Sequence, residues 1–331
     1  MSAFIKAISY YLPSEILTNS QLSAEFPEWS AEKIANKIGV SERHISDSGE
    51  TATDMAVKAA ENLFCEHSID RKQIDFVLLC TQSPDYFLPS SSCIIQNRLG
   101  LENKCGAFDF NLGCSGYEYG LAIANGLIVS GVAKNVLLLT AETYTKYIHP
   151  LDKGNRTIFG DAAAATLIST SGFARIGAFS LGTDGSGAEH LIVKSGASRQ
   201  PKRSEDIYLD ANGVLRSDDW LWMNGGAIFD FSAEVVPQII NDVLAKSNLE
   251  MDDINLFVFH QANKYMINYL RKILTIEKER FYICMDKVGN TVSSTIPIAL
   301  YEAKREGLLK GDILLAGFGV GLSWGATILH V

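Results

Sequence analysis

The chain has 331 residues, of which 47% are hydrophobic and 20% are charged, a balance typical of a soluble protein with one large domain or two ordinary ones. Its net charge of -9 argues against nucleic acid as a partner, because phosphate binding needs a concentrated basic surface. No apolar run is long enough to span a membrane, and the N-terminus lacks a signal-peptide pattern, so we expect a cytoplasmic protein. The six cysteines form no CxxC pair, so we expect reduced thiols and no metal site.

The first half of the chain alternates helical and strand-like patterns. A helical pattern over residues 53–66 leads through a polar turn to an apolar run that ends at Cys80, as in a buried strand. Residues 107–117 then pass from a strand-like run through small residues into a second helical pattern, and another apolar run follows at 136–139. This alternation predicts mostly parallel sheets covered by helices.

The second half repeats the first by residue class. A helical pattern over residues 234–246 precedes an apolar run that ends at His260, 180 positions after the run that ends at Cys80. Residues 308–316 resemble residues 131–139 in the same way. We therefore predict two duplicated α/β halves, residues 1–172 and 173–331, related by a pseudo-twofold axis.

Three residues are candidates for chemistry at the centre of such a pair. Cys114 lies between a strand-like run and a helical pattern, where the helix dipole would favour the nucleophilic thiolate, although an arbitrary cysteine is more often an inert core residue. His260 stands at the polar end of its strand, and Asn290 follows Gly289 in what is, taken alone, an ordinary turn. The duplication predicts that all three meet in one site.

These residues carry a resemblance to a known family. The order of the motifs resembles that of the β-ketoacyl-acyl-carrier-protein synthase III group of the thiolase superfamily. The motifs are Cys114, then His260-Gln261-Ala262-Asn263, then Gly289-Asn290-Thr291 and a glycine-rich tail. The resemblance runs through nearly the whole chain and includes residues 39–44, 159–164 and 317–325. It implies a thiolase-like α/β fold layered α-β-α-β-α and a role in fatty acid biosynthesis.

The resemblance also implies a two-step reaction. Cys114 would take an acyl group from a thioester, with the N–H groups of Cys114 and Val320 forming the oxyanion hole. His260 and Asn290 would then hydrogen-bond the malonyl thioester oxygen and stabilise the enolate that forms as carbon dioxide leaves. Val320 stands where the family usually has glycine, which would narrow the site.

Partners and substrate contacts follow from the same resemblance. It implies a homodimer, an acyl carrier protein as partner, and no cofactor beyond the coenzyme A or carrier-protein thioesters that serve as substrates. The residues implied to bind substrate are Lys33, Lys37, Phe87, Leu88, Lys153, Arg156, Asn263 and Gly319. Those implied to dock the carrier protein are Lys264, Arg271 and Lys272.

The chain departs from the family where coenzyme A binds. Lys33 and Lys37 replace a tryptophan and an arginine, Trp29 is nearby but out of register, and Lys153 replaces another arginine for which Arg156 could compensate. Lysine does not reproduce flat stacking or bidentate phosphate contacts. We therefore expect acetyl-CoA to be a poor donor relative to larger or carrier-bound acyl thioesters.

Two other functions remain open. A specialised acyltransferase on the same fold would move the acyl group from Cys114 to another acceptor without chain extension, and would release no carbon dioxide. A non-catalytic partner subunit would form no acyl adduct, although the intact Cys114, His260 and Asn290 set argues against it.

Overall fold

The computed structural model describes residues 2–204, 206–209 and 215–331. Its main feature is a nine-stranded sheet with the strand order β13-β14-β15-β8-β1-β7-β6-β4-β5. The strands of the first half are β1 (Phe4–Tyr11), β4 (Phe76–Cys80), β5 (Gly106–Phe110), β6 (Asn135–Glu142) and β7 (Ala162–Ser169). Those of the second half are β8 (Ala174–Thr183), β13 (Ile254–Phe259), β14 (Asp312–Gly319) and β15 (Ser323–His330).

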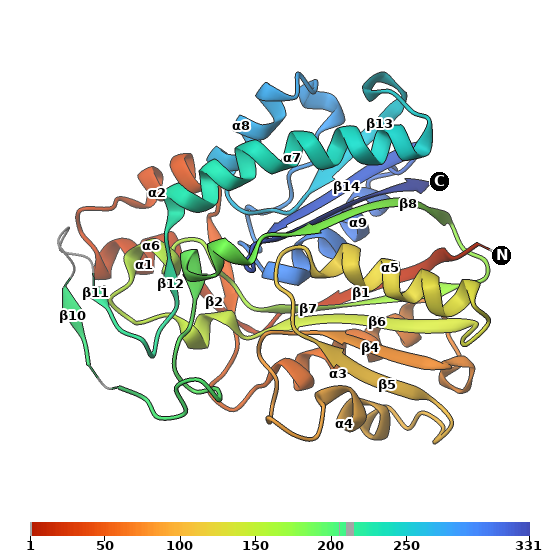
Figure 1. The fold of residues 1–331 in the computed structure, drawn as a ribbon. Coiled ribbons are helices and arrows are strands. Elements are labelled where there is room, and N and C mark those ends of the chain that lie inside the picture. Colours follow the sequence, from red (N-terminus) through yellow and green to blue (C-terminus); the bar gives the residue numbers. More distant parts are fainter. Residues whose placement is uncertain (1, 205, 210–214) are drawn as a thin grey trace.

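Helices divide the molecule into layers, visible from top to bottom in Figure 1. The outer layers are α7 (Gly225–Ser247) with α8 (Lys264–Ile273) on the side of the second half, and α3 (Ala52–Glu66) with α4 (Ser91–Arg98) on the side of the first. The middle layer is α5 (Gly116–Val129) and α9 (Thr295–Arg305). Strands β1 and β8 pair at only two positions, so the two parts of the sheet separate beyond that junction and enclose α5 and α9. The thiolase-like layering expected from the sequence is present.

The order of elements repeats in the two halves. In each, an outer helix (α3 or α7) leads to a strand (β4 or β13), and a middle helix (α5 or α9) leads to the next strand (β6 or β14). Strand β4 is parallel to β6, and β13 is parallel to β14. The parallel β4–β5 pair is matched in the second half only by a single bridge between Phe257 and Phe281. The boundary at residue 172 stays a prediction.

The sheet is mixed, so the expectation of mostly parallel strands is wrong. Strands β7 and β15 each run antiparallel to the strand before them in the chain, β6 and β14. Strand β15 returns directly after a tight turn that follows Gly319, which leaves no chain for the crossover helix that a parallel connection needs. Alternation of helices and strands in the sequence does not detect such returns.

The predicted local elements are confirmed with shifted bounds. The helix expected at 53–66 is α3, the strands ending near Cys80 and His260 are β4 and β13, and Cys114 lies between β5 and α5. The helix expected at 234–246 begins earlier, at Gly225, because the Asn224 side chain caps it by accepting from the Ala227 N–H over 3.2 Å. Helix α5 lies between the two parts of the sheet, and its Tyr117 and Leu121 side chains are fully buried.

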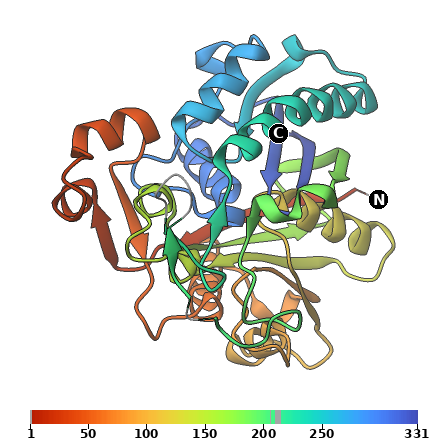
Figure 2. The same cartoon turned by 60° about the vertical axis from the view of Figure 1, so that its left-hand side comes forward.

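The remaining elements form a cap beside the sheet. Figure 2 brings this side forward and shows the first helices and the short ribbons together there. The cap contains β2 (Glu15–Thr18), α1 (Asn19–Glu25), α2 (Ala31–Ile38), β3 (Glu42–Ile45), α6 (Lys153–Arg156), β9 (Leu191–Ile192), β10 (Tyr208–Leu209), β11 (Leu215–Arg216) and β12 (Trp222–Met223). Short 3₁₀ turns are η1 (Arg71–Gln73), η2 (Tyr144–Tyr147), η3 (Gly185–His190), η4 (Met251–Asp253), η5 (Lys278–Arg280) and η6 (Val292–Ser294). Within the described ranges, no helix is long and apolar enough to cross a membrane.

Candidate active site

Cys114 sits in a tight turn between β5 and α5. The turn is closed by a hydrogen bond from the Gly116 N–H to the Gly113 carbonyl over 2.8 Å, and the Cys114 side chain is buried. Gly319, at the end of β14, passes directly over it: a Cβ added to Gly319 would lie 3.1 Å from the Cys114 Sγ. The glycine of the tail is therefore needed for clearance above the nucleophile.

The thiol is not activated as the sequence suggested. Burial raises the pKa of Cys114 above its ordinary value, and the buried carboxyl groups of Glu142 and Glu118 raise it further, whereas the Cys114 backbone N–H acts in the opposite direction. In the resting site, burial therefore acts against the effect that the sequence predicts for the helix N-terminus. Loss of water around the sulfur disfavours the thiolate, because a buried charge loses most of its solvation.

His260 is fixed by hydrogen bonds at both ends. Its backbone N–H donates to the Ala316 carbonyl over 2.8 Å, and its Nδ1 lies 2.8 Å from the Thr295 Oγ1 at the start of α9. Burial lowers the pKa of His260 to about 3, so the imidazole is neutral at physiological pH. The Thr295 hydroxyl donates to the Val292 carbonyl over 3.1 Å, which leaves its oxygen to accept from an Nδ1–H group.

Asn290 is held beside His260. Its Nδ2 lies 3.4 Å from the His260 Nε2 and donates to the Ala262 carbonyl over 3.3 Å. A parallel bridge to Phe159 fixes its backbone. The structure therefore brings together two of the predicted residues by direct contact, from segments that are 30 positions apart.

The end of β14 links this pair to the nucleophile. The Phe318 ring packs edge-on against the His260 ring with centroids 5.8 Å apart, and the next residue, Gly319, covers Cys114. On the other side, a Cβ added to Gly113 would lie 3.3 Å from the Val292 Cγ1 and 2.5 Å from the Val320 Cγ1. The Val320 side chain thus borders the turn of the nucleophile, and the oxyanion role of its N–H stays a prediction.

The other motifs of the resemblance support this framework. Arg43 is fully buried and donates to the Leu17 and Thr157 carbonyls over 3.1 and 3.0 Å, which joins strands β2 and β3 of the cap to the end of α6. Asp161 accepts hydrogen bonds from the Ser46 hydroxyl and the Thr145 N–H over 2.7 and 2.9 Å. These residues hold the segments around the site in place.

Residues implied to bind coenzyme A are arranged differently from the expectation. The Lys33 and Lys37 ammonium groups lie 5.6 and 5.9 Å from the ring centroid of Trp29, so an aromatic face and two cations stand together despite the shift in register. Lys153 forms an ion pair with Glu28 over 2.6 Å, and Arg156 forms one with Glu25. Arg156 thus has an acidic partner in the structure, and its role in place of the missing arginine stays a prediction.

The remaining predicted residues are scattered. Phe87 and Leu88 are 84% and 82% exposed on a loop between β4 and α4, away from any contact that would make them core residues. The Asn263 side chain caps α8 by accepting from the Met266 N–H over 2.9 Å. Lys264 and Lys272 are exposed on α8, whereas Arg271 donates to the Ile276 carbonyl over 2.9 Å.

Sequence reasoning missed four residues around the site, which share burial and polarity: Glu118, Glu142, Ser293 and Thr295. A carboxylate in an otherwise apolar helix or at the end of an apolar strand was a usable signal for the first two. Among the described residues, no group of His, Cys, Asp or Glu could hold a metal ion.

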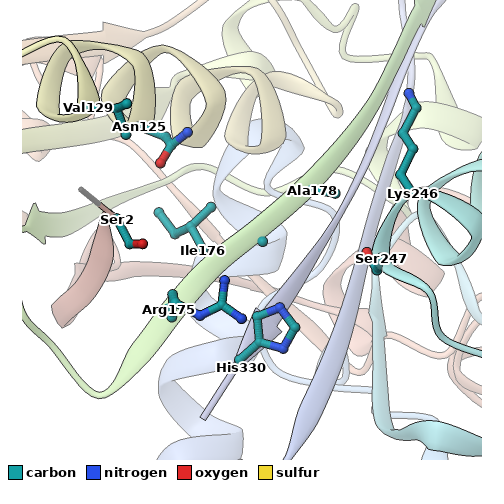
Figure 3. Close-up of a pocket in the computed structure, with 10 residues that line it drawn as sticks. Ser2, Asn125, Val129, Arg175, Ile176, Ala178, Lys246, Ser247 and His330 are labelled. Carbon is teal, nitrogen blue, oxygen red and sulfur yellow. The ribbon is translucent and has the colours of Figure 1, made fainter.

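A surface cavity of about 380 Å³ lies elsewhere, lined by Arg175, Lys246 and His330 (Figure 3). Arg175, the second residue of β8, pairs with His330. Thr183, at the other end of β8, pairs with Ser323, beyond the turn that follows Gly319. The cavity is thus at the opposite end of the strand from Cys114.

Comparisons with known proteins identify the family. Residues 108–185 match the family model of 3-oxoacyl-[acyl-carrier-protein (ACP)] synthase III, and residues 244–331 match that of its C-terminal part. The chain is 35% identical to a β-ketoacyl-[acyl-carrier-protein] synthase III of Caldanaerobacter subterraneus subsp. tengcongensis, with 99% of this chain and 98% of that protein covered. It is 38% identical to one of Clostridium perfringens, with 97% of each covered.

Solved structures give the same result. A crystal structure of a 3-oxoacyl-(acyl-carrier-protein) synthase III superposes with a TM-score of 0.97 at 46% identity, with both chains fully covered. The β-ketoacyl-[acyl carrier protein] synthase III of Thermus thermophilus superposes with a TM-score of 0.88 at 33% identity, with 99% of each chain covered. The chain therefore belongs to the β-ketoacyl-acyl-carrier-protein synthase III family.

Proposed function

We propose that this protein is a cytoplasmic β-ketoacyl-acyl-carrier-protein synthase III, which transfers an acyl group to Cys114 and condenses it with a malonyl-acyl-carrier-protein thioester. The observation that carries the proposal is the arrangement around the end of β14, where Gly319 covers Cys114 and Phe318 contacts the His260–Asn290 pair. A thiol and two neutral hydrogen-bonding side chains in one dry site suit a reaction that passes through an oxyanion and an enolate. No cofactor is needed for either step.

In the first step, the Cys114 sulfur attacks the carbonyl carbon of the acyl thioester. Because the thiol is neutral in the resting site, its proton must leave as the new S–C bond forms. The C–S bond of the donor breaks, and the thiolate that leaves takes up a proton. The Cys114 N–H, which lies against its own sulfur, and the Val320 N–H would stabilise the negative oxygen of the intermediate.

In the second step, the malonyl thioester loses carbon dioxide and its enolate attacks the acyl-cysteine, which releases the Cys114 thiolate. Neutral His260 and the Asn290 amide would donate to the thioester oxygen on which the enolate charge develops. For His260 to donate from Nε2, the Thr295 hydroxyl must turn from the Val292 carbonyl to Nδ1. A buried, neutral imidazole suits this role because it can donate a hydrogen bond to the enolate oxygen without transferring a proton to it.

The proposal includes two protein partners. The exposed segment formed by Tyr86, Phe87 and Leu88 presents a large apolar surface, which supports burial against a second copy in a homodimer. The cations Lys264, Arg271 and Lys272 on α8 would attract an acidic carrier protein. A monomer in light scattering at micromolar concentration would contradict the homodimer.

The decisive experiment follows the two steps separately. The wild-type protein is mixed with acyl-CoA or acyl-carrier-protein donors, and intact mass spectrometry counts the acyl group on Cys114, with Cys114→Ser as the control. Malonyl-acyl-carrier protein is then added, and released carbon dioxide is measured. An adduct followed by carbon dioxide release supports the synthase. An adduct without release indicates acyl transfer without chain extension, and no adduct indicates a non-catalytic subunit.

A further inference from the structure

Glu142 is a buried carboxyl group that the proposed reaction does not use. It ends β6 with no exposed surface. Its two oxygens accept from the Gln82 N–H over 3.2 and 3.0 Å, from the Ser83 hydroxyl over 3.2 Å, and from the Ser293 hydroxyl over 3.1 Å. Two separate segments of the chain therefore converge on one side chain.

The first of these segments borders the nucleophile. A Cβ added to Gly113, the residue before Cys114, would lie 2.8 Å from the Gln82 Oε1. The same Gln82 oxygen accepts from the Tyr144 hydroxyl over 3.3 Å. Glu142 thus fixes the backbone of a residue whose side chain lies against the turn of Cys114.

The second segment holds the His260–Asn290 pair. Ser293 follows Val292, whose N–H donates to the Asn290 Oδ1 over 2.9 Å and whose carbonyl accepts from Thr295, the partner of His260. Val292 has a φ of +55°, a left-handed conformation that is unfavourable for a β-branched residue and persists only where neighbouring contacts impose it. The bond from Ser293 to Glu142 is one of those contacts.

We propose that Glu142 is a positioning residue that, through Ser293, holds Asn290 and His260 in the geometry required for condensation. This inference rests on the proposed function and adds a residue to its second step. A carboxyl group suits the place because its two oxygens can accept from three neighbouring donor groups. Glutamine would direct an N–H group toward at least one of these donors, so it cannot replace all the contacts.

The charges around Glu142 add a pH dependence. The titratable groups near it are Cys80, Cys114, Tyr144, Tyr147 and Asp161. Burial raises the pKa of Glu142 to about 8. Above that pH the carboxylate accepts from both serine hydroxyls, whereas below it the carboxylic acid has a proton of its own to donate. The contact with Ser293 is therefore expected to tighten as pH rises through 8.

The test separates condensation from acylation. Wild type, Ser293→Ala, Glu142→Gln and the control Ser169→Ala are first acylated, with adducts counted by intact mass, and then mixed with malonyl-acyl-carrier protein in a single turnover. Ser169 is a matched control because its hydroxyl is also buried and also bonded to β6. It donates to Asn135, at the end of β6 opposite Glu142, over 2.7 Å. Thermal melting of each variant monitors the fold.

We expect Ser293→Ala and Glu142→Gln to slow condensation about tenfold or more. Ser293→Ala should change acylation by less than about threefold, whereas Glu142→Gln also removes a carboxyl group that raises the pKa of Cys114 and is therefore compared only after full acylation. Ser169→Ala should leave both steps unchanged. Wild-type condensation should rise between pH 7 and 9, and this rise should be absent in Glu142→Gln. Condensation at the wild-type rate in either variant, or equal loss of both steps in Ser293→Ala, would overturn the inference. Absence of carbon dioxide release by the wild type would instead overturn the proposed function, and the inference with it.

Discussion

The two sides of the site are built by different means. On one side, hydrogen bonds fix the polar side chains: His260 is bonded to Thr295, and Asn290 is bonded to the Ala262 carbonyl. On the side of Cys114, the structure provides clearance: glycine at position 319 leaves room above the sulfur. Hydrogen bonds set orientation, whereas clearance sets access. The comparison teaches that condensation should be sensitive to lost contacts, and acylation to added bulk.

The largest expected effect tests the clearance above Cys114. A methyl group added in Gly319→Ala would lie 3.0 Å from the Cys114 Cβ and 3.1 Å from its Sγ, closer than ordinary side-chain contacts. We expect acylation to fall on the order of 100-fold, since a displacement of about 1 Å at a reacting atom has such an effect. Gly126→Ala on α5 is the matched control, because an added Cβ there meets nothing within 4 Å. Equal acylation rates for the two variants, measured by intact mass, would refute the clearance argument.

The second effect concerns the ionisation of the nucleophile. Because burial and two carboxyl groups raise the pKa of Cys114, the thiolate fraction grows about tenfold per pH unit throughout the neutral range. Alkylation of Cys114 by iodoacetamide, followed peptide by peptide, should rise without a plateau up to pH 9. Alkylation of the exposed Cys65 and Cys93 in the same sample serves as the internal control for reagent activity at each pH. A plateau below pH 8 would show that the helix dipole prevails after all.

A smaller effect tests the cap. Trp29, with Lys33 and Lys37 beside it, presents an aromatic face to which the adenine of coenzyme A could bind. We expect Trp29→Ala to raise the KM for acyl-CoA donors by a few-fold to about tenfold, as expected for loss of a stacking or cation–π contact. The KM for acyl-carrier-protein donors should not change. Equal changes for both donor classes would assign Trp29 to the fold of the cap.

The smallest effect is on stability. Glu118 is fully buried and its two carboxyl oxygens have no hydrogen-bond partner among the described residues. Burial raises the pKa of Glu118 well above its ordinary value of 4.5. The folded protein therefore favours the protonated side chain, and the free energy of unfolding falls as pH rises, because the unfolded chain can ionise Glu118 more easily. Glu118→Gln should therefore stabilise the protein at pH 8 by on the order of 1 kcal/mol, or about 2 °C in Tm, and by less at pH 5. A difference in Tm between Glu118→Gln and the wild type that does not grow with pH would contradict this.

The sequence predicted the features that depend on local pattern. The strand, turn and helix around Cys114 and the strand that ends at His260 follow from periodicity and from small residues at the turn. The duplication also placed the Cys114 and Asn290 regions correctly, because each precedes a middle helix, α5 or α9.

Features that depend on distant contacts could not be predicted in this way. The raised pKa of Cys114 comes from burial and from Glu142 on another strand, and no local pattern reports either. The ion pairs of Lys153 with Glu28 and of Arg156 with Glu25 join segments more than 120 positions apart, so sequence alone left both cations available for substrate. The antiparallel strands β7 and β15 were missed because alternating helical and strand-like patterns do not report the direction of a strand.

The central claim is that the two sides of the site serve separate half-reactions, and the most direct measurement is on His260→Ala. Acyl adduct on Cys114 is counted by intact mass, and carbon dioxide release from malonyl-acyl-carrier protein is measured on the same sample. The account predicts an adduct at close to the wild-type rate and condensation reduced on the order of 100-fold or more, because a neutral, buried imidazole acts on the enolate. Loss of the adduct itself would make His260 the base for the thiol and contradict the account.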